Sequence, residues 1–108
     1  MYLVHVSLHR APGAELPEET ADWVRAAARP DERVEHVVAH PRAVPAPVVG
    51  IFLLADRLED AEALALLVYR RAMAQRPGLA GWLPLHARVP LLAPYYERLL
   101  ADPGVDGI

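Results

Sequence analysis

Hydrophobic and polar residues alternate along residues 2–9 (YLVHVSLH) before Arg10 and Pro12 end the pattern. Successive side chains of a β-strand point to opposite faces, so this alternation predicts a strand with one apolar and one polar side. The apolar side carries Tyr2, Val4, Val6 and Leu8, and the other side carries Leu3, His5, Ser7 and His9. We therefore expect a central strand that turns one side to the core and presents two histidines on the opposite face.

Three later stretches also have the length and composition of strands. Residues 34–40 (VEHVVAH) are rich in β-branched residues, but neither of their two sides is consistently apolar, so their facing stays open. Residues 48–55 (VVGIFLLA) are almost continuously apolar, as in a strand covered on both faces, and Gly50 indicates either a close approach or a bulge. Residues 82–89 (WLPLHARV) alternate again, and Pro84 predicts an edge strand because proline donates no backbone hydrogen bond. The side of this strand that is expected to face the core carries Leu83, Leu85, Ala87 and Val89.

Apolar residues recur every three or four positions in two longer stretches, which predicts amphipathic helices. The first runs over residues 17–29 and begins with an acidic turn, and the second runs over residues 57–76 with Asp56 as the expected N-cap. On the second helix, Arg70 and Arg71 and the acidic cluster Glu59, Asp60 and Glu62 are expected to form the solvated side. A short third helix is expected over residues 92–101, docked on the sheet, on a helix or on a second subunit.

The order strand, helix, strand, strand, helix, strand predicts one α+β domain over residues 1–108. Right-handed crossovers favour a ferredoxin-like βαββαβ arrangement, with a four-stranded antiparallel sheet in the order 4-1-3-2 and both long helices on one face. Over residues 2–89 this architecture resembles the dimeric α+β barrel superfamily, in which two open sheet faces close on each other. That resemblance implies a homodimer, and members of the superfamily include cofactor-independent monooxygenases, polyketide cyclases, lactone isomerases, haem-degrading enzymes and proteins without known catalysis.

In such a fold the sheet face away from the helices collects an unusual set of side chains. If residues 34–40 face as their histidines suggest, it carries His5, His9, His36, His40 and His86, together with Trp82 and Arg88 and with apolar residues from residues 48–55. A contiguous apolar patch on a soluble protein usually marks an interaction site. We therefore expect a homodimer formed through this face, with a monomer covered by the C-terminal helix as the alternative.

The spacing of the histidines argues against a metal site. His5 and His9, like His36 and His40, are four residues apart, which on a strand is about 13 Å and too far for two ligands of one ion. The first and second strands have the third between them, so their histidines are not expected to pair, which leaves His86 beside His5 or His9. We expect neither a metal nor a cofactor.

A catalytic interpretation assigns proton transfer to His86 and the anchoring of an enolate or carboxylate to Arg88. The ligand-binding side chains would then be His5, His9, His36, His40, Trp82, Tyr95 and Tyr96. In the alternative interpretation, the histidines only form hydrogen bonds within a half-polar subunit interface.

Composition excludes several function classes. The chain has no cysteine, so disulfides and thiolate chemistry are excluded, and its net charge of -3 lacks the basic patch of a nucleic-acid binder. No signal peptide or membrane span is recognisable, so we expect a cytoplasmic protein that binds neither membrane nor nucleic acid. All 11 basic residues are arginine, which is typical of a high-GC bacterial genome. Nucleotide-binding, nucleophile-elbow and zinc-protease motifs are not recognisable in the sequence.

These observations predict a small homodimeric protein that binds an organic ligand in a histidine-lined pocket, as an accessory or cofactor-independent enzyme of bacterial specialised metabolism. The catalytic part of this expectation rests on analogy of fold. The alternative is a non-catalytic dimerisation, regulatory or protein-interaction module that uses the same face.

Overall fold

The computed structural model describes residues 1–10 and 12–90. The expected C-terminal helix over residues 92–101, with Tyr95 and Tyr96, lies outside these described residues. The elements in chain order are β1 (Tyr2–Leu8), α1 (Thr20–Ala27), the 3-10 turn η1 (Pro30–Glu32), β2 (Val34–His40), β3 (Val48–Leu53), α2 (Leu58–Gln75), the 3-10 turn η2 (Pro77–Leu79) and β4 (Pro84–Arg88).

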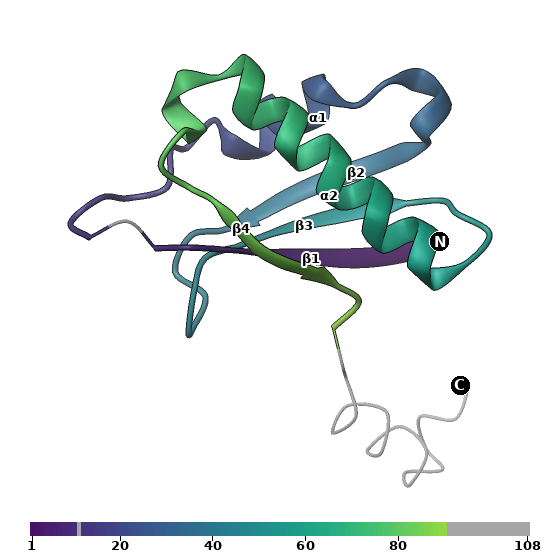
Figure 1. Cartoon of the computed structure of the whole chain (residues 1–108), viewed down its shortest axis with the longest axis horizontal. Coiled ribbons are helices and arrows are strands. Elements are labelled where there is room, and N and C mark those ends of the chain that lie inside the picture. The colour runs from purple at the N-terminus through teal and green to yellow at the C-terminus, as the bar shows by residue number, and fades with distance from the viewer. Residues whose placement is uncertain (11, 91–108) are drawn as a thin grey trace, which may run out of the picture.

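The four strands form one antiparallel sheet in the order β2-β3-β1-β4, which is the order 4-1-3-2 counted from the opposite edge. Both helices, α1 and α2, lie on the same side of the sheet (Figure 1). The described chain is therefore an α+β structure of two layers, compatible with a ferredoxin-like fold. β1 is a central strand, as its alternating pattern predicted.

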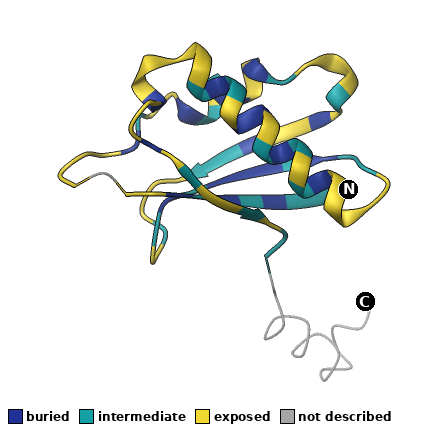
Figure 2. Cartoon of the chain, in the orientation of Figure 1, coloured by how far each residue is buried: buried dark blue, intermediate teal, exposed yellow. Residues whose placement is uncertain are grey.

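The core lies between the sheet and the helices. Burial alternates along β1, as Figure 2 shows by the change between dark blue and teal along that strand. In β3 the alternation is interrupted at Gly50, which is buried like its neighbours Val49 and Ile51. The fully buried residues of the two strands are Val4, Val6, Leu8, Val49, Ile51 and Leu53. Val24 of α1 and Val68 of α2 belong to the same cluster. The apolar side of β1 therefore faces the helices, and its other side faces away from them.

Both helices begin later than the sequence predicted. The first helical residue of α1 is Thr20 rather than Pro17, and the Thr20 hydroxyl donates a 2.7 Å hydrogen bond to the Pro17 carbonyl. The expected cap at Asp56 is wrong, because Arg57 occupies the N-cap position of α2 and makes no side-chain capping bond. Arg57 instead forms a 3.3 Å ion pair with Asp60 in the first turn.

Two charged residues of α2 are tied into the fold rather than solvated. Arg71 donates to both carboxylate oxygens of Glu32, at 2.7 and 2.8 Å, and to the Ala27 carbonyl. Glu62 accepts a 3.1 Å hydrogen bond from the backbone N–H of Val89, just after β4. These contacts join α2 to the end of α1 on one side and to β4 on the other, so the sequence prediction of a solvated surface is wrong for both residues.

β4 is shorter than expected, and a bulge interrupts its pairing with β1. Leu8 lies opposite Pro84 and Ser7 opposite His86, so Leu85 is the extra residue between them. Leu85 is 58% exposed and Leu83, before the strand, is 53% exposed. The prediction that these two leucines face the core is wrong, because the bulge changes the phase of the alternation.

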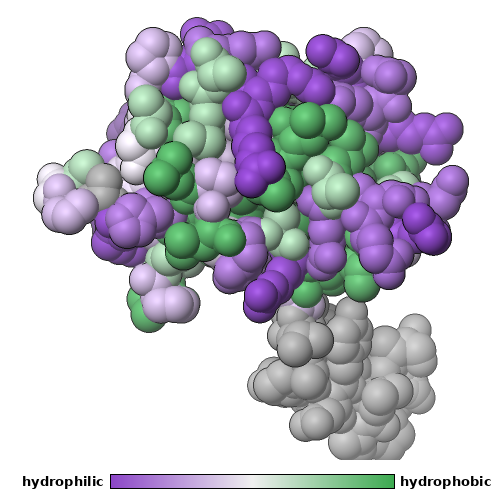
Figure 3. Space-filling model, in the orientation of Figure 1, coloured by the Kyte–Doolittle hydropathy of each residue, from purple (hydrophilic) through white to green (hydrophobic). Residues whose placement is uncertain are grey.

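The surface seen in Figure 3 mixes hydrophilic and hydrophobic residues in small patches. Among residues 1–10 and 12–90, no helix has both the length and the apolar character that crossing a membrane requires.

Candidate functional site

The candidate site is the sheet face turned away from α1 and α2, which we call the open face. Its central strands contribute residues that alternate with the buried core positions of β1 and β3. They are Leu3, His5, Ser7, Val48, Gly50 and Phe52. All except Gly50 are half-buried. The middle of the open face is therefore largely apolar, with the imidazole of His5 among these side chains.

The outer strand β2 adds two more histidines to the open face. His36 lies opposite Phe52 and His40 lies opposite Val48, and residues that face each other in antiparallel strands point to the same side. A bulge between Val34 and His36 makes the pattern of this strand ambiguous in the sequence. The structure thus places His36, Val38 and His40 on the open face. This is the facing of residues 34–40 that the two histidines suggested.

At the other edge of the sheet, β4 contributes His86 and Arg88. Their Cα partners on β1 are Ser7 and His5, so both side chains belong to the open face, and both are exposed. Four of the five predicted histidines therefore share one face. The fifth, His9, is exposed beyond the end of β1, where its backbone N–H donates to the Leu83 carbonyl at 2.8 Å.

The imidazoles of His5 and His40 approach each other across the intervening strand β3. Their ring centroids are 6.2 Å apart, with the ring planes tilted by 59°. This contact corrects the sequence prediction that histidines of the first and second strands cannot pair. On β3, the residue opposite His5 is Gly50, which contributes no side chain of its own at this point of the face.

Gly50 is closely surrounded on the open face. A Cβ atom built there would lie 3.1 Å from Val38 Cγ2, 3.3 Å from Leu3 Cδ1 and 3.6 Å from His5 Cδ2. The neighbouring side chains therefore converge over the glycine, and of the two roles expected for Gly50, a close approach or a bulge, the structure shows the close approach.

The electrostatics of His5 differ from those of a solvated imidazole. Burial, and secondarily the charge of His40, lower the pKa of His5 from its ordinary value of 6.5. Both effects penalise the imidazolium form. His5 is therefore neutral at neutral pH and can accept a hydrogen bond or bind a cation.

Trp82 is not part of the open face, so the sequence prediction of its position is wrong. Its side chain is 4% exposed and belongs to the core cluster. Its carbonyl accepts a 2.6 Å hydrogen bond from the buried hydroxyl of Tyr69 on α2. This bond and the turn η2 hold Trp82 under the helix layer, two residues before β4 begins. The predicted aromatic wall at Tyr95 and Tyr96 lies outside the described residues.

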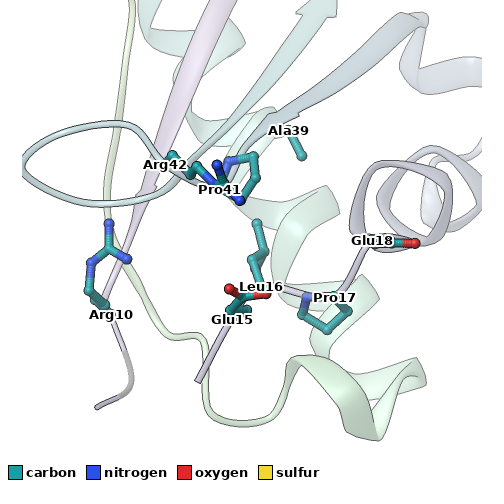
Figure 4. A pocket seen from close by; sticks show the side chains of 8 residues that line it. All are labelled: Arg10, Glu15, Leu16, Pro17, Glu18, Ala39, Pro41 and Arg42. Carbon is teal, nitrogen blue, oxygen red and sulfur yellow. The ribbon is translucent and has the colours of Figure 1, made fainter. Parts of the chain in front are cut away.

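Three clefts of the described structure lie away from the histidines. One, of about 390 Å³, lies between the segment before α1 and the end of β2, and Figure 4 shows Arg10, Arg42, Glu15 and Glu18 among its lining side chains. Two others lie beside the end of α1 and between α2 and the segment before β4. None of these three clefts is lined by a histidine. The cleft at Arg10 and Arg42 could not be predicted from the sequence, because both arginines stand in proline-containing loops.

Within residues 1–10 and 12–90, no group of three or more histidine or acidic side chains is close enough to hold a metal ion. No protein-family model, no curated protein and no solved structure matches this chain.

Proposed function

We propose that this protein is a homodimer whose two open faces pack against each other and enclose a binding site for a small organic anion. The observation that carries the proposal is the distribution of side chains on the open face. Half-buried apolar residues lie on the central strands, and exposed polar residues lie on the outer strands. Protein interfaces have this arrangement, with an apolar core and a polar rim.

The apolar centre consists of Leu3 on β1 and of Val48 and Phe52 on β3. The rim consists of His36 and His40 on β2 and of His86 and Arg88 on β4. The face also lies on the side of the sheet opposite both described helices (Figure 1). A second copy of the same face supplies the apolar surface that this centre lacks.

The distribution of charge on the open face favours a second copy of the chain as the partner that covers it. In a two-fold dimer the same surface meets itself, so like charges on it would repel. Among the described residues of the open face, Arg88 is the only one with a permanent charge, and it lies on the edge strand. His5, near the centre, is kept neutral by its lowered pKa. Two such faces can therefore pack without an uncompensated charge at their centre.

The ligand class follows from the pairing of Arg88 with His5. These residues are Cα partners on β4 and β1. A guanidinium binds a carboxylate or enolate through paired hydrogen bonds, and a neutral imidazole beside it accepts or donates one more. In the catalytic form of the proposal, His86 exchanges a proton with the ligand while Arg88 holds its negative charge.

A non-catalytic role is the second candidate, because no histidine lines any of the three clefts described for the single chain. In that case the open face serves dimerisation or holds a partner protein. The two candidates share the dimer and differ in whether the closed faces leave room for a ligand.

Sedimentation velocity of the full chain tests the dimer. We expect the mass of two chains for the wild type and of one chain for Phe52→Glu, which places a charge at the centre of the open face. Leu67→Glu is the matched control, because Leu67 is 51% exposed on α2 in the other layer, and it should remain dimeric. A monomeric wild type, or a Phe52→Glu variant that stays dimeric, overturns the proposal.

Nuclear magnetic resonance titration with a panel of small aliphatic and aromatic carboxylates separates the two candidates. Ligand binding predicts saturable shifts of the His5 and His86 ring signals that are lost in Arg88→Gln. The control Arg70→Gln, which changes an exposed arginine of α2, should keep these shifts. A dimer whose histidine signals respond to none of the carboxylates would support the non-catalytic module.

A further inference from the structure

We infer that His5 and His40 form a two-imidazole site for a divalent transition-metal ion, placed over Gly50 on the open face. The pair is distinct from the histidines four residues apart, which the strand geometry separates. It joins the central strand β1 to the edge strand β2, across β3. The site is complete within one chain, so it does not depend on the proposed dimer.

The distance between the rings suits one bridging ion. An imidazole nitrogen lies about 2.0–2.1 Å from a bound zinc ion, so two rings on one ion have centroids roughly 5–6 Å apart, depending on the angle at the metal. The observed centroid distance is 6.2 Å. The two rings are therefore close to the separation that one shared ion requires.

The position of the His5 ring also supports the proposed site. Its Cδ2 atom, which is bonded to Nε2, lies 3.6 Å from the point where a Gly50 Cβ would stand. This edge of the ring therefore lies over Gly50 on β3, the strand between His5 and His40. A side chain in place of Gly50 would contact this edge of the ring as well as Val38 and Leu3.

A fixed positive charge beside the two imidazoles would repel a metal ion. Arg88 is the permanent charge nearest in register, and it lies on the β4 side of His5, away from Gly50 and His40.

The ligand set defines the class of metal. Imidazole without carboxylate suits copper, nickel and zinc and does not suit magnesium or calcium. Two protein ligands leave further coordination positions for water or for an anion. Copper(II) is the most sensitive probe, because it binds most tightly to nitrogen ligands among the divalent first-row metals.

Calorimetric titration of the untagged full chain with copper(II), followed by electron paramagnetic resonance, tests the site. We expect one tightly bound copper per chain, with a spectrum of two imidazole nitrogens, and a wild type that binds no copper tightly overturns the proposal. His5→Gln and His40→Gln should each weaken binding about tenfold or more. His9→Gln is the matched control and should bind as the wild type does, because His9 is exposed beyond the end of β1.

Gly50→Val tests the geometry while keeping both imidazoles. Valine suits a strand, and the closest atoms that its Cβ meets belong to side chains of Val38 and Leu3, so the fold can adjust. We expect weakened copper binding with a retained circular dichroism spectrum, and if the variant fails to fold, the two histidine variants decide the question. The proposal is overturned if His5→Gln and His40→Gln bind copper as tightly as the wild type, or if His9→Gln weakens binding equally.

Discussion

His5 and His40 come from strands that are not neighbours, yet their ring centroids lie only 6.2 Å apart. The strand between them carries Gly50, which has no side chain, at the position opposite His5. The same proximity lets the charge of His40 act on His5 and lower its pKa, together with the larger effect of burial. The two imidazoles are therefore coupled both in position and in charge.

The free energy of unfolding should rise with pH over the range in which His5 loses its proton. Its pKa is lower in the folded chain than the ordinary value of 6.5, so the unfolded chain binds more protons between the two values. The folded state is therefore fully favoured above pH 6.5 and loses stability as the pH falls from 6.5 through the folded pKa. The groups facing His5 are His40 on β2 and Arg88 on β4.

Urea unfolding at a fixed protein concentration between pH 5 and 8 measures this effect. His5→Gln should flatten the dependence on pH, and His40→Gln should reduce it by removing the repelling charge. His9→Gln should leave the slope of the wild type. An unchanged slope in His5→Gln contradicts the assignment.

The ion pair between Glu32 and Arg71 should stabilise the chain above the acid range. The hydrogen bonds from Arg71 lower the pKa of Glu32 from its ordinary value of 4.5 to about 2, aided by the backbone N–H of Arg29 and opposed by burial. Because the folded pKa is the lower one, this stability is present above pH 4.5 and is lost as the pH falls toward 2. Both side chains are largely covered, at 10% and 16% exposed.

Thermal unfolding of Glu32→Gln at pH 7 should show a Tm lowered by roughly 5 °C. The difference from the wild type should shrink as the pH is lowered from 4.5 to 2.5. Glu59→Gln, which changes an exposed carboxylate in the first turn of α2, should leave the Tm within about one degree. A Tm difference between Glu32→Gln and the wild type that does not vary with pH would contradict the ion-pair explanation.

Tyr69→Phe should destabilise the fold by about 1–3 kcal/mol, because it leaves the buried Trp82 carbonyl without its partner. Tyr69 is fully buried, and burial raises the pKa of its hydroxyl, so this group remains a hydrogen-bond donor. Urea unfolding measures the loss, and a changed near-ultraviolet circular dichroism would report displacement of Trp82. The control Tyr2→Phe alters a half-buried tyrosine at the start of β1, and a loss as large in this control would contradict a specific role for the Tyr69 hydroxyl.

Much of the sheet could be predicted from the sequence, because the alternation along β1 and the apolar run of β3 are direct consequences of strand geometry. The predictions are wrong where one extra residue in a strand shifts the alternation of its side chains. Bulges next to His36 and at Leu85 interrupt the alternation of β2 and β4. These bulges explain why the sequence does not determine which side of β2 faces the core. They also explain why Leu85, which was predicted to face the core, is exposed.

The candidate site was predictable as a set of residues but not as a geometry. The histidines of the open face follow from strand facing, whereas the His5 and His40 contact depends on the register of three strands around Gly50. Trp82 was misplaced because the alternating pattern continues through it. Its hydrogen bond to Tyr69, 13 positions earlier, is a tertiary contact that no local pattern indicates.

The central claim is that two chains pack through their open faces, and isotope-filtered nuclear Overhauser spectroscopy on a mixture of labelled and unlabelled chains tests it most directly. The account predicts contacts between chains that involve the Phe52 ring, the Leu3 methyl groups and the His5 imidazole. A dimer whose contacts between chains come only from residues of α2 or the other helix-layer surface would contradict it. A sample in which sedimentation finds single chains, and in which no contacts between chains are observed, would also contradict the account.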